Sequence, residues 1–160
     1  MMKSRQKGYR RSMNALIDTN IILDAVEVRQ GFFDDSSKII SSITEYKGYI
    51  AASNVTDIYY IEHKRNHSKK KTTKLMKSLF EIFDILDTTA EDCRNALRSD
   101  VTDYEDAVLV ESAIRNDIDC IVTRNTKDFK KARIPVYAPA EFLRLLRTKH
   151  EREQHGKEKY

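Results

Sequence analysis

The sequence is poor in the residues that mark several large classes of protein. Its 160 residues include two cysteines, two prolines, four glycines and no tryptophan. Cys93 and Cys120 form neither a CxxC pair nor an even framework, which predicts reduced thiols in a cytoplasmic protein. The low glycine and proline content excludes collagen-like and low-complexity chains. Apolar runs of only three or four residues exclude a membrane span.

The composition is that of one globular domain, with 40% apolar and 34% charged residues. A chain of this length buries enough surface to fold without a disulfide or a structural metal. The formal net charge is +4, but residues 1–12 carry five basic side chains and no acid, so residues 13–160 have a net charge of −1. We therefore expect a basic leader (1–12) that is disordered or an extension, a folded domain (13–147) and a charged C-terminal tail (148–160).

Short apolar segments alternate along the chain with segments of helical periodicity. Strands are predicted at 14–18, 48–52, 83–86, 119–123 and near 135–137. Helices are predicted at 20–28, 34–46, 53–63, 68–82, 89–98, 103–115 and 139–147, with a helical turn at 126–131. Strands separated by helices predict an α/β domain of three layers, with a central parallel sheet of about five strands between two layers of helices.

Acidic side chains follow or adjoin three of the predicted strands. Asp18 ends the first, Asp57 lies one turn into the helix after the second, and Asp103 and Asp106 open the helix before the fourth. Asp103 and Asp106 are three apart, so both can occupy one helical face. Ligands of open α/β sheets bind outside the carboxyl ends of the strands, so we expect these four acids in one crevice.

Each acid also has a simpler interpretation. Asp18 and Asp103 could be helix caps, and Asp57 and Asp106 could be solvated. The neighbouring Glu105 is predicted to be solvated. Carboxylates that do share a pocket either have raised pKa values or surround a cation, and oxygen ligands suit Mg²⁺ or Mn²⁺. Such an ion can activate water for phosphodiester hydrolysis, which predicts a metal-dependent nuclease.

Basic side chains are concentrated in two segments, 64–77 and 124–133. Such residues bind phosphates with little regard to sequence. A solvated helix face is the alternative for the first segment. The candidates for RNA phosphate contacts are Arg124, Lys127, Lys69, Lys70 and Lys71.

Four segments together resemble PIN-domain proteins, in particular the toxins of virulence-associated (VapC-type) toxin–antitoxin pairs. They are LIDTNIILD (16–24), SNVTDIYYI (53–61), DYEDAVLVESA (103–113) and IVTRNTKDF (121–129), followed by PAEFL (139–143). The resemblance covers 13–146. It implies a sheet of about five parallel strands, an acidic pocket that binds Mg²⁺ or Mn²⁺, and cleavage of single-stranded RNA by a metal-activated water. It also implies inhibition by a cognate antitoxin and, often, a homodimer.

The resemblance assigns roles to individual acids. Asp18 matches the first acid of the family, Asp57 the second, which is more often Glu, and Asp106 the third. Asp103 matches an accessory acid. These four are the expected catalytic and metal-binding residues.

Three polar residues match further positions of the family's pocket. Asn20 and Thr123 match polar positions that line it. Asn125 stands where the family usually has a fourth acid in a TxD pattern; its carbonyl oxygen can coordinate a metal but adds no charge. Asp128 either compensates for that charge or belongs to a local turn.

These observations favour a cytoplasmic Mg²⁺- or Mn²⁺-dependent endoribonuclease, the toxin of a toxin–antitoxin pair. One alternative is a catalytically weak RNA-binding or regulatory module. Another is a phosphatase of the haloacid dehalogenase kind, which Asp18-Thr19-Asn20 disfavours because it lacks the second Asp of that family's DxD motif. We expect the leader to be dispensable for cleavage.

Overall fold

The computed structural model describes residues 12–157, so the predicted leader (1–12), apart from Ser12, and the last three residues lie outside the described part of the chain. Its five strands form one parallel sheet in the order β3-β2-β1-β4-β5. The strands are β1 (Asn14–Ile17), β2 (Lys47–Ala51), β3 (Asp84–Leu86), β4 (Cys120–Val122) and β5 (Val136–Tyr137). The predicted α/β class and five-stranded parallel sheet are confirmed.

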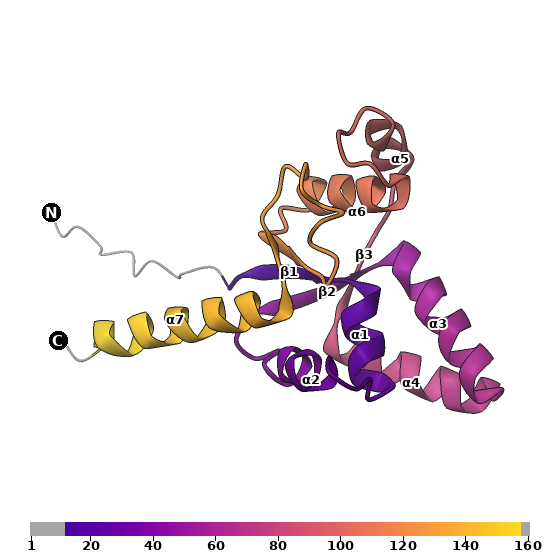
Figure 1. The fold of residues 1–160 in the computed structure, drawn as a ribbon, viewed down its shortest axis with the longest axis horizontal. Helices are drawn as coiled ribbons and strands as arrows, with labels where there is room; N and C mark the ends of the chain where they lie inside the picture. The colour runs from indigo at the N-terminus through magenta and orange to yellow at the C-terminus, as the bar shows by residue number, and fades with distance from the viewer. Residues whose placement is uncertain (1–11, 158–160) are drawn as a thin grey trace, which may run out of the picture.

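Helices cover both faces of this sheet (Figure 1). The α5–α6 layer lies on one face, and α1 to α4 lie on the other, where α7 also packs. The helices are α1 (Thr19–Val26), α2 (Phe33–Ser41), α3 (Ala52–Asn66), α4 (Lys69–Ile82), α5 (Ala90–Ala96), α6 (Tyr104–Arg115) and α7 (Pro139–Lys157). The arrangement is the expected three-layer domain.

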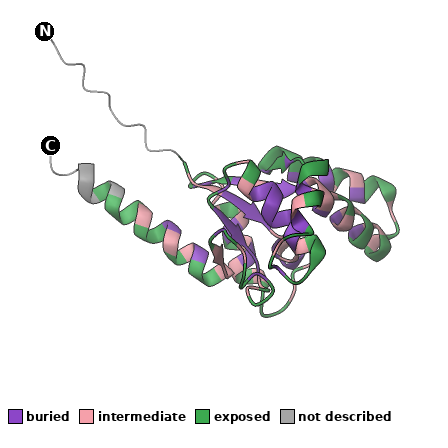
Figure 2. Cartoon of the chain, turned by 90° about the horizontal axis from the view of Figure 1, so that it is seen from above, coloured by how far each residue is buried: buried purple, intermediate pink, exposed green. Residues whose placement is uncertain are grey.

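Alternation of side chains along the strands divides the core in two. In β1, Ala15 and Ile17 pack on the α1–α4 side, whereas Leu16 packs on the α5–α6 side. In β4, Val122 joins the first cluster and Ile121 the second. All of them are buried, because helices cover both faces, and this explains why the central segments of β1 and β4 are apolar on both faces. Figure 2 shows the buried sheet between its helices.

The C-terminal helix differs from the prediction. We expected it to end near 147 and to be followed by a fraying tail, but α7 continues to Lys157. Its outer half extends away from the domain (Figures 1 and 2). Residues 147–155 contain no glycine or proline and are rich in Lys, Arg, Glu and Gln, which favour helix without needing a packing partner. Within residues 12–157, no helix combines the length and apolar character needed to cross a membrane.

The order of the strands in the sheet reverses direction between β1 and β4. From β1 the chain adds β2 and β3 on one side, and β4 and β5 on the other. In open α/β sheets this point of reversal leaves a crevice at the carboxyl ends of the central strands. Asp18 follows β1 and Thr123 follows β4, so both residues lie at this crevice.

Candidate active site

Asp18 is held rigidly where β1 ends. Its Oδ1 accepts a hydrogen bond from the Thr19 backbone N–H at 2.7 Å, so it caps α1, as the simpler interpretation proposed. Its Oδ2 accepts from Thr123 Oγ1 at 2.7 Å and from Asn20 Nδ2 at 2.9 Å. Three donors therefore fix this carboxylate, and capping does not exclude a functional role.

The first turn of α6 brings further carboxylates to the same place. Asp103 is the N-cap and accepts a hydrogen bond from the Asp106 backbone N–H at 3.1 Å. The cap interpretation of Asp103 is thus also correct. Glu105 is exposed, as we predicted, and it also lines the pocket with Asp103 and Asp106.

The third contribution comes from the first turns of α3. Asp57 and Asn54 are three residues apart, so they lie on one helical face, and both line the pocket. We predicted a helix at 53–63; α3 begins one residue earlier, at Ala52, and its N-cap, Ala51, makes no side-chain cap bond.

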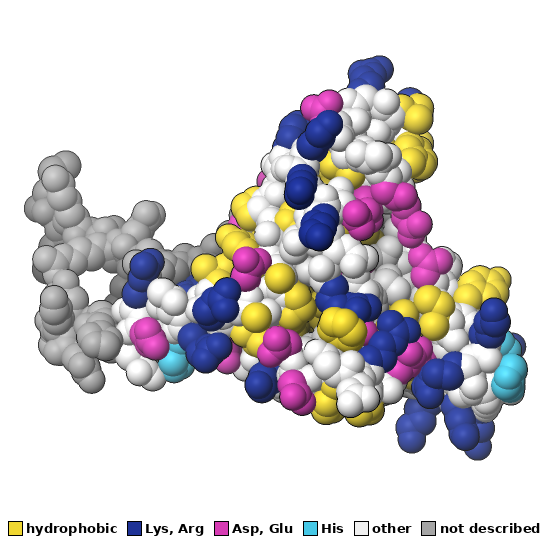
Figure 3. Space-filling view, in the orientation of Figure 1, with side chains coloured by type: hydrophobic (Ala, Val, Ile, Leu, Met, Phe, Trp, Pro, Cys, Tyr) yellow, Lys and Arg dark blue, Asp and Glu magenta, His cyan; other side chains and the backbone are white. Residues whose placement is uncertain are grey.

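These segments enclose an acidic cavity of about 490 Å³. In Figure 3 acidic side chains gather on the surface between the α5–α6 layer and α3. The described polar and charged residues that line the cavity are Asp18, Thr19, Asn20, Arg29, Asn54, Asp57, Asp103, Glu105, Asp106 and Asn125. The four predicted acids therefore line one pocket, as the strand-end rule led us to expect.

The carboxylates influence one another's protonation. Burial, and then the negative charges of Asp103 and Asp18, raise the pKa of Asp106 to about 7. Burial also raises the pKa of Asp18, against the opposing hydrogen bond from Thr123. For Glu105, burial and the adjacent Asp57 raise the pKa. The pocket thus carries more negative charge than its own donors neutralise.

This excess charge predicts that Asp106→Asn stabilises the protein in the absence of divalent metal. The raised pKa means that the fold favours the neutral acid, so the penalty appears above the unfolded pKa near 4 and is complete above about 7. We expect the variant to gain at least about 1 kcal/mol at pH 8 and little at pH 4. Urea unfolding in EDTA at both pH values measures this difference. A gain of equal size at both pH values would contradict the electrostatic explanation.

The predicted supporting residues lie behind and beside the acids. Thr123 is fully buried; its hydroxyl donates to Asp18 and accepts the Asn125 backbone N–H at 3.0 Å. Asn20 Oδ1 accepts the Arg124 backbone N–H at 3.3 Å. Thr123 and Asn20 thereby connect the segment after β4 to Asp18, and Asn125 lines the pocket.

Arg124 is engaged inside the protein. Its guanidinium forms an ion pair of 2.8 Å with Asp24, which is completely buried, and stacks on the ring of Phe32 at 4.0 Å. Sequence reasoning missed Asp24 as its partner, because the two lie 100 residues apart. This pair fastens the segment after β4 to α1, so Arg124 has a structural partner whether or not it also contacts RNA.

The other predicted phosphate contacts do not line the pocket. Lys127 is exposed in the turn after β4. Lys69, Lys70 and Lys71 are exposed in the first turn of α4, beyond the far end of α3 (Figure 1). They could contact only parts of a long substrate outside the cavity.

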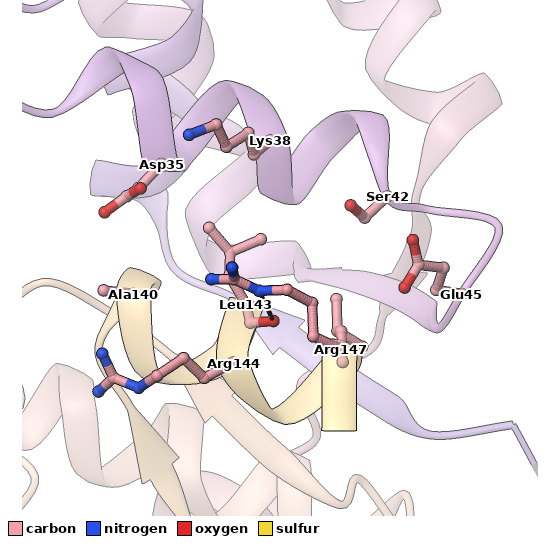
Figure 4. Close-up of a pocket in the computed structure, with 9 residues that line it drawn as sticks. Asp35, Lys38, Ser42, Glu45, Ala140, Leu143, Arg144 and Arg147 are labelled. Carbon is pink, nitrogen blue, oxygen red and sulfur yellow. Dashed lines mark hydrogen bonds between the residues drawn. The ribbon is translucent and has the colours of Figure 1, made fainter. Parts of the chain in front are cut away.

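A second pocket lies between α2 and α7 (Figure 4). Lys38 and Asp35 of α2 face Arg144 and Arg147 of α7 there. It contains side chains of both charges and none of the sequence-predicted catalytic residues, so the acidic cavity is the better candidate for chemistry.

The acidic cavity has the donors that a hard divalent cation prefers, namely carboxylate oxygens and the amide oxygen of Asn125. Its surplus negative charge, expressed in the raised pKa of Asp106, is what such a cation would neutralise. Among the described residues, no three His, Cys, Asp or Glu side chains are placed so as to hold an ion between them. The type of donors and the surplus charge, rather than the present spacing of the side chains, therefore support a metal here.

Fold and pocket together define a class: a parallel α/β domain with several carboxylates at the carboxyl edge of its sheet. The sequence model of the PIN domain matches residues 14–127, and the chain belongs to that family. PIN domains are typically nucleases that use divalent metals. A comparison with curated protein sequences gives no match. Membership of the PIN family leaves the phosphatase alternative without support.

Solved structures of similar fold include components of toxin–antitoxin complexes. One is a toxin–antitoxin complex from Klebsiella pneumoniae, with 25% identity, a TM-score of 0.58, and coverage of 78% of this chain and 97% of that one. VapBC2 from Rickettsia felis, bound to a promoter DNA fragment, has 17% identity, a TM-score of 0.59, and coverage of 79% and 98%. VapC20 from Mycobacterium tuberculosis, described as a sarcin-ricin loop cleaving toxin, has 10% identity, a TM-score of 0.55, and coverage of 67% and 86%.

Proposed function

We propose that this protein is an endoribonuclease that uses Mg²⁺ or Mn²⁺ to cleave single-stranded RNA. One observation carries the proposal: a single pocket of a PIN domain gathers five carboxylates, from the end of β1 and the first turns of α3 and α6. The resemblance to VapC toxins supports RNA as the substrate. The exposed lysines of α4 and Lys127 provide positive charge for the flanking phosphates.

The residues of the pocket have separable roles in this proposal. A bound Mg²⁺ or Mn²⁺ would supply an activated water and stabilise the charge that develops at the phosphate. Asp18, fixed by Thr123 and Asn20, presents its oxygens in one orientation. Asp103 and Asp106 bring negative charge from the start of α6, and Asp57 brings it from α3. These four residues would hold the ion, and Asn125 would add a neutral oxygen.

The same proposal includes a protein partner. The Klebsiella and Rickettsia structures are toxin–antitoxin complexes. We propose that this chain likewise acts as a toxin in the cytoplasm, restrained by a cognate antitoxin, and that it can form a homodimer. Growth arrest on expression, relieved by the antitoxin, is the behaviour expected of such a pair.

Cleavage of RNA by the purified full chain tests the enzymatic proposal. Single-stranded RNA incubated with the protein and Mn²⁺ should be cut, and the same mixture in EDTA should remain intact, because the carboxylates need an ion to activate water. Denaturing gel electrophoresis of end-labelled RNA measures the products. Binding of RNA without cleavage in Mg²⁺ or Mn²⁺ would instead favour the RNA-binding alternative.

A further inference from the structure

Asn54 has an unused hydrogen-bond donor in the acidic pocket. The residue is 3% exposed, and its Nδ2 has no hydrogen-bond partner within the described part of the protein. A buried donor without an acceptor costs about 1–3 kcal/mol. The fold of α3 does not need this amide, because the helix begins without a side-chain cap. Asn54 therefore weakens the protein unless a ligand supplies the acceptor.

Asn20 provides the comparison, because it is an asparagine in the same pocket whose amide is fully used. Its Nδ2 donates to Asp18, and its Oδ1 accepts the Arg124 backbone N–H. Contacts within the protein thus satisfy the side-chain amide of Asn20, whereas they leave Nδ2 of Asn54 without an acceptor. The difference between them points to an acceptor from outside the chain.

The surroundings of Asn54 indicate what kind of acceptor fits. Arg29 is the one basic side chain among the described residues that line the pocket, and it is already paired with Glu27 at 2.6 Å and Asp24 at 3.5 Å. Asn54 thus adds an unused donor to a pocket that is otherwise rich in carboxylates. An amide donor beside a proposed site for a divalent cation suits an anionic oxygen such as that of a phosphate. The torsion about the Cβ–Cγ bond of Asn is soft, so an incoming oxygen can draw Nδ2 toward the pocket at little cost.

We propose that Asn54 binds the RNA, with its Nδ2 donating to a non-bridging phosphate oxygen of the strand in the pocket. This assignment rests on the proposed function and adds a substrate-positioning residue outside the set of acids. Asn54 would orient the phosphate while the carboxylates hold the ion. This assignment predicts that replacing Asn54 weakens RNA binding but lowers neither the affinity for metal nor the stability of the fold.

The test compares Asn54→Leu, which keeps the size but removes the donor, with Asn54→Ser, which restores a shorter one. RNA binding is measured by fluorescence anisotropy with a labelled single-stranded oligonucleotide and Mn²⁺, in an Asp106→Asn background that slows cleavage. We expect Asn54→Leu to weaken binding at least about tenfold and Asn54→Ser to recover part of it. Calorimetric Mn²⁺ affinity, in the native background, should not change. The melting temperature should stay the same or rise, because an unsatisfied buried amide is removed.

Two control variants separate this role from general damage. Asn20→Leu should lower the melting temperature, because it breaks bonds within the protein. Asn95→Leu, in α5 and outside the acidic pocket, should leave RNA binding and cleavage unchanged. Unchanged RNA affinity in Asn54→Leu, or a fall in melting temperature as large as that of Asn20→Leu, would overturn the assignment.

The outcome also separates this inference from the proposed function. If the wild-type protein cleaves RNA and Asn54→Leu binds it normally, only the role of Asn54 fails. If the wild-type protein does not cleave, but binding depends on Asn54, the enzymatic proposal fails and the contact stands. If the Asp106→Asn protein binds no RNA, the contact is overturned, whatever the wild-type protein cleaves.

Discussion

Asp106→Asn should lower the rate of RNA cleavage by about a thousandfold, and Asp18→Asn should do the same. Each change removes one negative charge from the pocket proposed to hold the ion and keeps the volume of the side chain. Losing about 4 kcal/mol of transition-state stabilisation corresponds to this factor. Initial rates of cleavage at saturating Mn²⁺ measure the effect. The Asp106 variant should be more stable and less active at once, a combination that general unfolding cannot produce.

Asp34→Asn is the matched control for these substitutions. Asp34 is exposed on α2, remote from the acidic pocket, and the same chemical change there should leave the rate unaltered. Full activity of both Asp106→Asn and Asp18→Asn would show that the pocket is not the site of cleavage.

The largest effect on stability is expected from Asp92→Ala. Asp92 is buried and joins α5 to α6, because it accepts hydrogen bonds from Arg115 Nε at 2.9 Å and Ser112 Oγ at 3.1 Å. It also accepts the Thr89 backbone N–H, which completes a capping box. Its removal takes the acceptor from the buried Ser112 hydroxyl and leaves Arg115 paired with the exposed Asp87 alone, which should cost about 3 kcal/mol, or about 10 °C in melting temperature. Thermal and urea unfolding followed by circular dichroism measure both values.

The pH dependence of stability tests whether the ionised Asp92 carboxylate is responsible for this difference. Burial raises the pKa of Asp92, but the hydrogen bonds from Arg115 and Thr89 outweigh it and lower the pKa to about 2. A lowered pKa means that the stabilisation is fully present above the unfolded pKa near 4 and is lost as the pH falls toward 2. The difference between wild type and variant should therefore shrink over this range.

Asp87→Ala is the control for the ion pair. Asp87 also contacts Arg115, at 2.8 Å, but its side chain is 66% exposed. Solvent screens such a pair, so its loss should destabilise the protein much less than the loss of Asp92. Equal losses at Asp87 and Asp92 would contradict the view that burial and the shared hydrogen bonds make Asp92 important.

The fold was predictable because its signals are local. Short apolar runs such as 120–122 indicate strands covered on both faces, and their alternation with amphipathic helices predicts a parallel sheet. Helix ends were less predictable. The charged segment after 147 has no breaker before Gly156, and its helix propensity, rather than packing, carried α7 to Lys157.

The position of the acidic pocket was also predictable, since the carboxyl ends of parallel strands meet at one edge. Asp18, Asp57, Asp103 and Asp106 line one cavity for this reason. Glu105 is exposed, as its sequence context suggested, but its place in the pocket could not be predicted. Only the tertiary structure brings Glu105 of α6 close to Asp57 of α3.

By itself, the sequence determined the class of fold, the edge of the sheet where chemistry is expected and the acids that reach it. These follow from periodicity and from residue spacing within single elements. The tertiary structure decided which side chains become partners: Asp18 with Thr123 across 105 positions, and Arg124 with the buried Asp24. It also left Nδ2 of Asn54 without a hydrogen-bond partner among residues 12–157. Such pairings depend on how separate elements pack, and burial then determines whether a polar group is solvated, satisfied or left for a ligand.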